Sequence, residues 1–540
     1  MANADLQKIL DRQSNNNVAK NVILFVGDGM GVSTVTAARI LKGQRKGQSG
    51  EEEKLSFEDF PHVGLSKTYS LDYQTPDSAA TATAFLGGVK TKSGVLGYDG
   101  RVKYGYCNTT SPQAEVDSIV QWSIAEGKST GLVTTTRVTH ATPAAAYAHS
   151  PDRTWEGDRR TMQTSRSQGC TDIAFQLIMN NSDIQVIMGG GRRFFLPANA
   201  IDPQTGRPNF GYGRLDGFNL IQEWIEDKVR RQKNHSYVWN KEQLDQVDTQ
   251  KVDYLLGLFK QSHMSYEIRR PPSEPSIADM TRKSLEILQR NEKGYFLMVE
   301  GGRIDHGHHA NLAKRALTDT LAFDEAVEVA KSMTNQSDTL IVVTADHSHT
   351  MVISGYASKG NPILGLVDRQ NVAPAIDGLP YTTLLYGNGP GYSITNSTRR
   401  NLTGIDTFGN SFRQETAVPM DSETHSAEDV AVYARGPMSH LFTGVHEQNI
   451  IATAMAYASC VGADKRHCES RLTETSASPT VPFRTPNAPS SSLDESETTT
   501  DTNLFSTIKV LEGYPASAAP SLQFMPVWTL LLTSCLVYNL

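Results

Sequence analysis

Residues 21–31 read NVILFVGDGMG, in which an unbroken apolar run over Val22–Val26 is followed by a glycine and Asp28. Apolar runs without alternation are typical of strands buried on both faces of a parallel sheet. Similar runs occur at Gly131–Thr136, Val186–Met188, Tyr295–Val299, Leu340–Thr344 and Asp429–Tyr433. Stretches with helical spacing, such as Ala278–Leu288 and Ala313–Ala330, separate them. The sequence therefore predicts an α/β fold with a mainly parallel central β-sheet sandwiched by helices.

Differences in composition divide the chain into segments. We expect an N-terminal helical arm over residues 1–20, with a short amphipathic helix at Asp5–Gln13. The main, catalytic α/β domain is expected over residues 21–354 and 421–470. Residues 355–420 are rich in Gly, Pro, Asn and Thr, which predicts a small β-rich crown subdomain inserted into the main domain.

Charge and cysteine content narrow the class of protein. A formal net charge of −7 provides no basic surface, so we expect no nucleic-acid partner. The five cysteines could be free, buried thiols, or Cys107 could pair with Cys170 and Cys460 with Cys468, leaving Cys535 in the apolar tail. Glycosylation sequons favour the second reading and the oxidising secretory route. They lie at Asn108, Asn180, Asn234, Asn335, Asn396 and Asn401.

The C-terminal region has the order of a lipid-anchor signal. Residues 471–515 are polar and predict a flexible stalk, and residues 516–540 end in the apolar tail Phe524–Leu540. The candidate attachment points are Ala516, Ser517 and Ala518. A single membrane-spanning helix is the alternative, but about 17 residues are at the short limit for spanning. We expect a GPI-anchored protein on the extracellular face of the plasma membrane, with a mature or engineered N-terminus.

Acidic and histidine side chains follow three of the predicted strands. They are Asp28 after the first strand, Glu300 and Asp305–His309 after the strand ending at Val299, and Asp346 and His347 after the strand ending at Thr344. Ligand sites in open α/β sheets lie beyond the carboxyl ends of the strands, so we expect these side chains at one edge. Each cluster alone could be a helix cap or a turn. Together their carboxylates would repel one another unless cations neutralised them, and Asp/His sets suit zinc whereas oxygen-only sets suit magnesium.

The candidate nucleophile is Ser78, in the segment TPDSAATATA over residues 75–84. Pro76 and Asp77 begin a turn, and the Ala/Thr run after Ser78 predicts the start of a helix. In one interpretation Ser78 is only the N-cap of that helix. In the other, the helix N-terminus holds a phosphate while a metal ion ionises the serine hydroxyl. The sequence has no GxSxG elbow, so a Ser-His-Asp hydrolase is not indicated.

Long motifs make residues 5–470 closely similar to the animal alkaline phosphatases. The motifs are NVILFVGDGMG, TPDSAATATA, VTTTRVTHATPAAAYAH, MGGGRR, VEGGRIDHGHH, VTADHSHT and ETHSAEDVAVYARGP. The resemblance implies an alkaline phosphatase-like fold and a homodimer anchored by a glycolipid. It also implies hydrolysis of a broad range of small phosphate monoesters through a phosphoserine intermediate, with two zinc ions and one magnesium ion per subunit.

The resemblance also implies a role for each matching residue. Ser78 matches the nucleophile, and Arg153 matches the arginine that binds phosphate. The implied ligands are Asp305, His309 and His425 for the first zinc ion, Asp28, Ser78, Asp346 and His347 for the second, and Asp28, Thr142 and Glu300 for magnesium. His140 and His306 match residues that flank the metal ions. Independently of the resemblance, we predict disulfides between Cys107 and Cys170 and between Cys460 and Cys468.

Some positions depart from the family pattern. Vertebrate relatives have an additional calcium site, whose matching positions here are Gln204, Phe259, Lys260 and Glu274. Only one of its three carboxylates remains and Lys260 adds a positive charge, so we do not expect calcium there. Ser422 stands near the mouth of the site where some relatives carry an acidic residue.

Tyr356 and the N-terminal helix bear on assembly. Tyr356 matches a residue that reaches into the partner subunit, and the helix resembles one that embraces the partner. Without the resemblance, Tyr356 would be an ordinary tyrosine that supports a strand of the insert.

Two other functions remain as alternatives. A phosphodiesterase or sulfatase of the same superfamily would use a threonine or a modified cysteine and would lack the magnesium ligands, so Ser78, Thr142 and Glu300 argue against it. The second alternative is a non-catalytic surface receptor on this scaffold. Such a receptor would not need all of the matching metal-ligand residues, and their presence argues against it.

Overall fold

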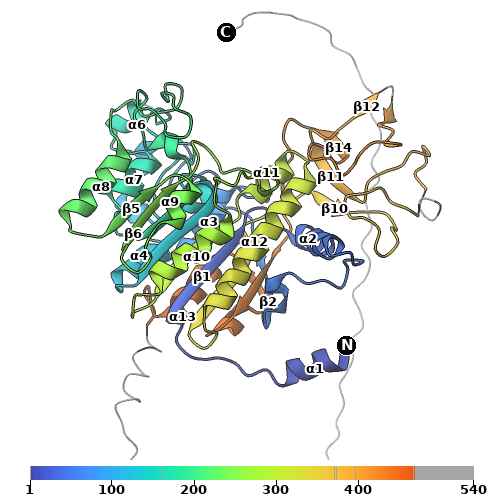
Figure 1. The fold of residues 1–540 in the computed structure, drawn as a ribbon, viewed down its shortest axis with the longest axis horizontal. Helices are drawn as coiled ribbons and strands as arrows, with labels where there is room; N and C mark the ends of the chain where they lie inside the picture. Colours follow the sequence, from blue (N-terminus) through green and yellow to red (C-terminus); the bar gives the residue numbers. More distant parts are fainter. Residues whose placement is uncertain are drawn as a thin grey trace, which may run out of the picture. The chain divides into compact units, whose positions relative to one another are not determined.

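The computed structural model describes residues 2–465 and Cys468, apart from residues 162, 370, 372, 373 and 396. Helices pack on both faces of a ten-stranded sheet (Figure 1). In spatial order its strands are β17 (Gly444–Glu447), β2 (His62–Lys67), β16 (Val430–Arg435), β8 (Thr339–Ala345), β1 (Asn21–Gly27), β7 (Tyr295–Glu300), β3 (Ser129–Arg137), β4 (Val186–Gly190), β6 (Tyr254–Leu258) and β5 (His235–Val238). The predicted α/β fold is confirmed.

One strand of the ten-stranded sheet runs in the opposite direction to its neighbours. Strand β16, predicted as Asp429–Tyr433, runs antiparallel to its neighbours β2 and β8. The other pairs of adjacent strands in this sheet are parallel. A sheet that is mainly, but not wholly, parallel is therefore confirmed.

The position of strand β1 explains why the run Val22–Val26 is wholly apolar. All seven residues are buried, and their side chains alternate between two hydrophobic cores. Val22, Leu24 and Val26 belong to one core, whereas Ile23 and Phe25 belong to the other. Because successive side chains of a strand point to opposite faces, a strand covered on both faces needs an unbroken apolar run.

The described residues form thirteen α-helices, most of which contribute side chains to these two cores. They are α1 (Ala2–Leu10), α2 (Val32–Arg45), α3 (Ser78–Gly87), α4 (Ile119–Ala125), α5 (Ala141–Ala144), α6 (Gln163–Ser167), α7 (Ile173–Met179), α8 (Leu220–Arg230), α9 (Lys241–Asp245), α10 (Ile277–Leu288), α11 (Arg303–His309), α12 (Ala313–Met333) and α13 (Ile450–Ser459). Helices α2, α10 and α12 contribute to one core, and α3, α4, α7 and α13 to the other. The helix predicted at Asp5–Gln13 exists but begins and ends three residues earlier, as α1.

Short strands form smaller sheets within and beside the segment predicted as an insert. Strands β10 (Met351–Ile353), β11 (Leu384–Gly389) and β14 (Thr416–Pro419) form a three-stranded sheet (Figure 1). Two further pairs are β12 (Ile394–Thr395) with β13 (Thr398–Arg399), and β9 (Ser348–His349) with β15 (His425–Ser426). The domain boundaries proposed from the sequence stay predictions.

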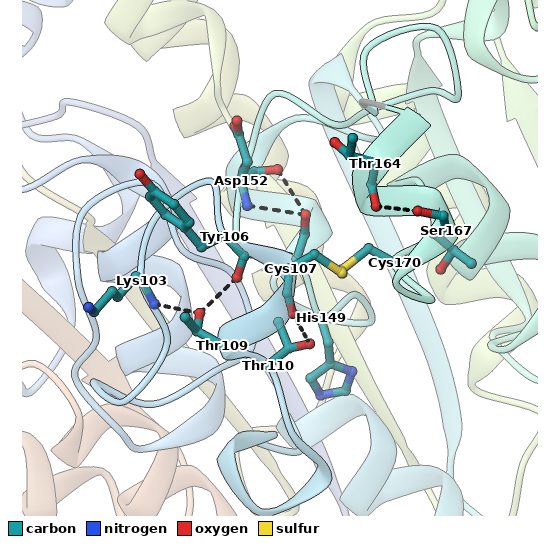
Figure 2. The surroundings of a disulfide bond; sticks show 12 residues. Lys103, Tyr106, Cys107, Thr109, Thr110, His149, Asp152, Thr164, Ser167 and Cys170 are labelled. Atoms are coloured by element: carbon teal, nitrogen blue, oxygen red, sulfur yellow. Dashed lines mark hydrogen bonds between the residues drawn. A yellow bond between two sulfur atoms is a disulfide. The ribbon is translucent and has the colours of Figure 1, made fainter.

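The cysteine pairs form two disulfides. Cys107 is bonded to Cys170 (Figure 2), and Cys460 is bonded to Cys468. The alternative of free thiols is therefore wrong for these four residues. The asparagines of the sequons are all exposed, except that Asn396 lies outside the described residues.

The targeting predictions concern residues that the structure does not describe. The stalk at 471–515, the anchor segment at 516–540 and Cys535 all lie outside the described residues. Within the described part of the chain, no helix combines the length and apolarity needed to cross a membrane.

Helix α10 provides a test of how local sequence sets an element. Ser276 Oγ accepts a hydrogen bond from Asp279 N at 3.0 Å, and Asp279 Oδ2 accepts one from Ser276 N at 3.0 Å. We predict that Ser276→Ala lowers the free energy of unfolding by about 1 kcal/mol, because a backbone N–H loses its acceptor. Denaturant unfolding measures this, with Ser273→Ala as control. An equal effect of both substitutions would contradict the role of the cap.

Candidate metal centre

Neighbouring parallel strands end at the same edge of the sheet and bring their following residues together. Strands β8, β1 and β7 are adjacent, and their register places Val26 of β1 opposite Thr344 and Glu300. Asp28, Glu300 and Asp346 therefore lie close together, and all three side chains are fully buried. As predicted, these acidic residues gather at the edge of the sheet where the strands end.

Asp305, His309 and His425 form one group of potential metal ligands. His309 Nδ1 bonds to the Glu423 carbonyl and His425 Nδ1 to the Pro76 carbonyl, so both Nδ1 atoms carry the hydrogen. The two Nε2 atoms are then lone-pair acceptors only 3.2 Å apart, and each is 3.2 Å from Asp305 Oδ1. Three acceptors in contact repel one another, and a cation between them removes that repulsion.

A second group surrounds the Ser78 hydroxyl. His347 Nδ1 donates to the Ser348 carbonyl at 3.2 Å, so Nε2 carries the lone pair. That Nε2 lies 3.3 Å from Ser78 Oγ, 3.1 Å from Asp346 Oδ2 and 3.5 Å from Asp28 Oδ1. One nitrogen and three oxygens in this arrangement suit zinc.

A third group offers oxygen atoms only. Asp28 Oδ1 and Oδ2, Thr142 Oγ1 and Glu300 Oε1 are buried and have no hydrogen-bond partner among the described residues. Burial raises the pKa of Asp28 well above its usual range, and the nearby carboxylates raise it further. Burial also raises the pKa of Glu300 to about 7. Unpartnered buried oxygens are rare, and together they suit magnesium.

The start of helix α3 places Ser78 beside Arg153. Asp77, not Ser78, is the N-cap, because its side chain accepts a hydrogen bond from Ala80 N at 3.2 Å. The interpretation of Ser78 as the N-cap is therefore wrong, and its hydroxyl is free for other contacts. Arg153 Nη1 donates to Asp77 Oδ2 at 3.0 Å, while Nη2 lies 3.4 Å from His140 Nε2. Asp77 thus caps the helix and holds the arginine.

His140 and His306 form a cluster with His263, which the sequence analysis missed. The ring centroids are 4.3 Å apart for His263 and His306, and 5.2 Å apart for His140 and His263. Arg137 bonds to His263, and Arg303 Nη1 lies 3.0 Å from His306 Nδ1. Because arginine only donates, the contacted ring nitrogens are acceptors, and the surrounding positive charge makes this a poor cation site.

His349 and Glu423 also escaped the sequence analysis. Buried His349 Nε2 lies 2.8 Å from Asp305 Oδ1, and its Nδ1 bonds to Glu423 Oε2. Burial acts to lower the pKa of His349, but the Glu423 and Asp305 carboxylates outweigh burial and raise it to about 10. A charged His349 therefore positions both carboxylates. The sequence could have indicated His349, because it lies two residues after His347 in the run DHSH at residues 346–349.

Fold and site together define a class of protein. Buried ligand groups next to a serine at a helix N-terminus and a fixed arginine are typical of a metal-dependent hydrolase of phosphate esters.

Comparison with known proteins narrows this class to a family. A family model described as alkaline phosphatase matches residues 19–461, and the chain belongs to the alkaline phosphatase family. It is 52% identical to the tissue-nonspecific isozyme of Rattus norvegicus (86% of this chain, 88% of the relative). It is 50% identical to the isozyme of Homo sapiens (86% and 87%) and to the alkaline phosphatase of Gadus morhua (86% and 97%). The chain is a metal-binding hydrolase of phosphate monoesters.

Solved structures agree on the fold. The alkaline phosphatase of Thermus thermophilus has a TM-score of 0.58 at 24% identity, covering 86% of this chain and 98% of that one. The enzyme of the Antarctic bacterium TAB5 has a TM-score of 0.56 at 21% identity, covering 83% and 100%.

His349 is predicted to act through the residues that it holds. We expect His349→Asn to weaken zinc binding by about 10- to 100-fold, because Asp305 and Glu423 lose their shared cation. Zinc retention against a graded series of chelator concentrations measures this. His446→Asn is the control, because His446 lies on strand β17 and its Nε2 bonds to the Thr443 backbone carbonyl. Equal zinc retention in both variants would remove His349 from this role.

Proposed function

We propose that this enzyme cleaves phosphate monoesters to an alcohol and inorganic phosphate through a phosphoserine at Ser78. The observation that carries the proposal is the Ser78 hydroxyl, 3.3 Å from the lone pair of His347 and beside unpartnered buried oxygens. Two zinc ions and one magnesium ion per subunit fit the three groups of ligands. The proposed ligands are Asp305, His309 and His425 for one zinc ion, Asp28, Ser78, Asp346 and His347 for the other, and Asp28, Thr142 and Glu300 for magnesium.

The residues of the chain then have distinct tasks. Bound divalent ions would lower the pKa of the serine hydroxyl and of water and would offset the charge of the phosphoryl group. Ser78 Oγ attacks phosphorus in line, and the ester oxygen leaves with the alcohol. Arg153 holds two phosphate oxygens through its planar fork, and Asp77 fixes its orientation. Water then cleaves the phosphoserine, which releases phosphate and restores the hydroxyl.

The alternatives make different predictions for substrates. A phosphodiesterase or a sulfatase would prefer the diester or sulfate analogue of a chromogenic phosphate monoester, and a non-catalytic receptor would cleave none of them. Side-by-side assays of the three compounds separate these functions. The position of Ser78 and the oxygen-only group at Thr142 and Glu300 favour the monoesterase.

We also propose a glycosylated, GPI-anchored homodimer at the cell surface. Exposed sequon asparagines and two disulfides support passage through the secretory route. Leu6, Ile9 and Leu10 on helix α1 are more than half exposed, as is Tyr356 at 69%, and such apolar surface is typical of a protein contact.

We further propose that Lys260 supplies a fixed positive charge where vertebrate relatives hold calcium. Lys260 Nζ lies 3.0 Å from Glu274 Oε2 and 2.9 Å from Ser265 Oγ. Glu274 is 2% exposed, so its carboxylate needs a counter-charge. Phe259 and Gln204 have uncharged side chains, so neither adds a second charge to this position.

Removing this charge is predicted to destabilise the protein. We expect Lys260→Met to lower the free energy of unfolding by about 1–2 kcal/mol, because Glu274 stays buried without its partner while Lys260 is partly exposed. Denaturant unfolding measures this. The double variant Lys260→Met, Glu274→Leu should recover much of the loss. A double variant less stable than Lys260→Met would contradict the pairing.

Ser78→Ala tests the proposed function directly. We expect kcat of the variant to fall by about 1,000-fold or more, because the covalent step needs the hydroxyl. Metal analysis should find its zinc content unchanged, since three other ligands of that group remain. Ser276→Ala, which also changes a serine at a helix start, serves as the control and keeps its turnover. Full turnover in Ser78→Ala would refute the role of Ser78.

A further inference from the structure

A second cleft opens directly beside the arginine of the site. Its volume is about 450 Å³, and two of its lining residues, Asp77 and Arg153, also belong to the catalytic group described above. The other lining residues are Asp72, Tyr73, Thr75, Pro76, Ser93, Gly94 and Tyr104. Because Arg153 lines this cleft, a substrate whose phosphate lies on Arg153 would have the cleft within reach of its leaving group.

The ring of Tyr104 is fixed in the wall of this cleft. Its hydroxyl donates to Asp152 Oδ1 at 3.2 Å. Its ring packs on Gly94, whose φ is +79°, so closely that a methyl group at Gly94 would meet Tyr104 Cε2 at 2.4 Å. Gly94 N donates to Asp77 Oδ1 at 2.9 Å, and Gly94 O accepts from Arg153 N at 2.9 Å. One glycine therefore ties the aromatic ring to the residues beside the nucleophile.

The segment that carries Tyr104 is anchored immediately after this residue. Gly105 N donates to the Pro151 carbonyl at 2.9 Å. Three residues after Tyr104, Cys107 forms its disulfide with Cys170, and Asp152 lies beside this segment (Figure 2). An aromatic surface that is held in advance loses little conformational entropy when a ligand binds.

The free faces of two tyrosines remain in contact with solvent. Tyr104 is 48% exposed, and Tyr73, which also lines the cleft, is 62% exposed. The Asp72 carboxylate in the lining accepts hydrogen bonds from Ser70 Oγ and Ser93 N, both at 2.9 Å. The cleft thus offers two aromatic side chains, and the Asp72 carboxylate beside them is already hydrogen-bonded. Such faces favour planar ring systems, which stack on them with little dependence on ring substituents.

We propose that this cleft binds a planar aromatic leaving group, such as a nucleobase or an aryl ring, against Tyr104, with Tyr73 at the rim. This inference rests on the proposed function and gives the enzyme a preference within its broad range of monoesters. Tyr104 acts here as a specificity-determining residue, and Ser78 and Arg153 perform the same chemistry on every substrate.

A matched pair of substrates tests the preference. Adenosine 5′-monophosphate and ribose 5-phosphate share the same ester bond and differ in the base, so their ratio of kcat/KM reports the cleft alone. We expect the zinc- and magnesium-loaded enzyme to favour the nucleotide by at least about five-fold through a lower KM, with similar kcat values. Phenyl phosphate in a parallel assay shows whether a small aryl ring suffices.

Three variants assign the preference to Tyr104. Tyr104→Leu should reduce the nucleotide-to-ribose-phosphate ratio to near one by raising the KM of the nucleotide. Tyr104→Phe keeps the ring on Gly94 and should retain most of the ratio. Tyr106→Leu is the control, because Tyr106 is an exposed tyrosine beside the same disulfide (Figure 2) but is not among the residues that line the cleft.

The outcomes separate this inference from the proposed function. An enzyme that cleaves both substrates with equal kcat/KM, or a Tyr104→Leu variant that keeps the wild-type ratio, overturns the aromatic cleft and leaves the monoesterase in place. A variant that loses both activities in parallel also overturns the inference, because the ratio would not have moved. An enzyme that cleaves neither substrate refutes the proposed function itself.

Discussion

Electrostatic repulsion among buried carboxylates is the constraint on which the site depends. Asp28, Glu300, Asp305 and Asp346 converge at one edge of the sheet, and two like charges 4 Å apart repel by about 4 kcal/mol at an effective dielectric constant of 20. Raised pKa values at Asp28, Glu300 and Asp346 express the same repulsion together with burial. Bound divalent cations remove it, so metal binding and folding stability are coupled in this molecule.

Backbone hydrogen bonds fix the orientation of the histidines that we propose as metal ligands. The parallel register places the ends of strands β1, β7 and β8 at the same height. Backbone carbonyls accept the Nδ1 hydrogens of His309, His347 and His425, so the Nε2 lone pairs of these rings point into the site. Asp77 couples the start of helix α3 to Arg153 in the same way. The groups are therefore positioned without reorganisation at the moment of reaction, which is the main source of electrostatic catalysis.

Sequence patterns predicted the parts of the site that depend on local order. A strand end followed by an acid, as at Asp28 and Asp346, signals its place at the sheet edge. Contacts between distant segments gave no such signal: Glu423 and His349 are 74 residues apart, and His263 reaches His306 from a separate loop. The direction of strand β16 was also not predictable, because an apolar run looks the same for a parallel and an antiparallel strand. Helix α3 begins at Ser78, so the residue that caps it is Asp77.

The proposed aromatic cleft is lined by Asp77 and Arg153, the two residues that also lie beside Ser78. Recognition of the leaving group and of the phosphate would therefore meet at this ion pair. The central claim concerns the cations. Anomalous diffraction from crystals of the native protein at the zinc absorption edge tests it most directly. The account predicts two strong peaks, one between Asp305, His309 and His425 and one between Asp28, Asp346 and His347. Anomalous density lying away from both groups, or none at all in crystals grown with zinc, would contradict it.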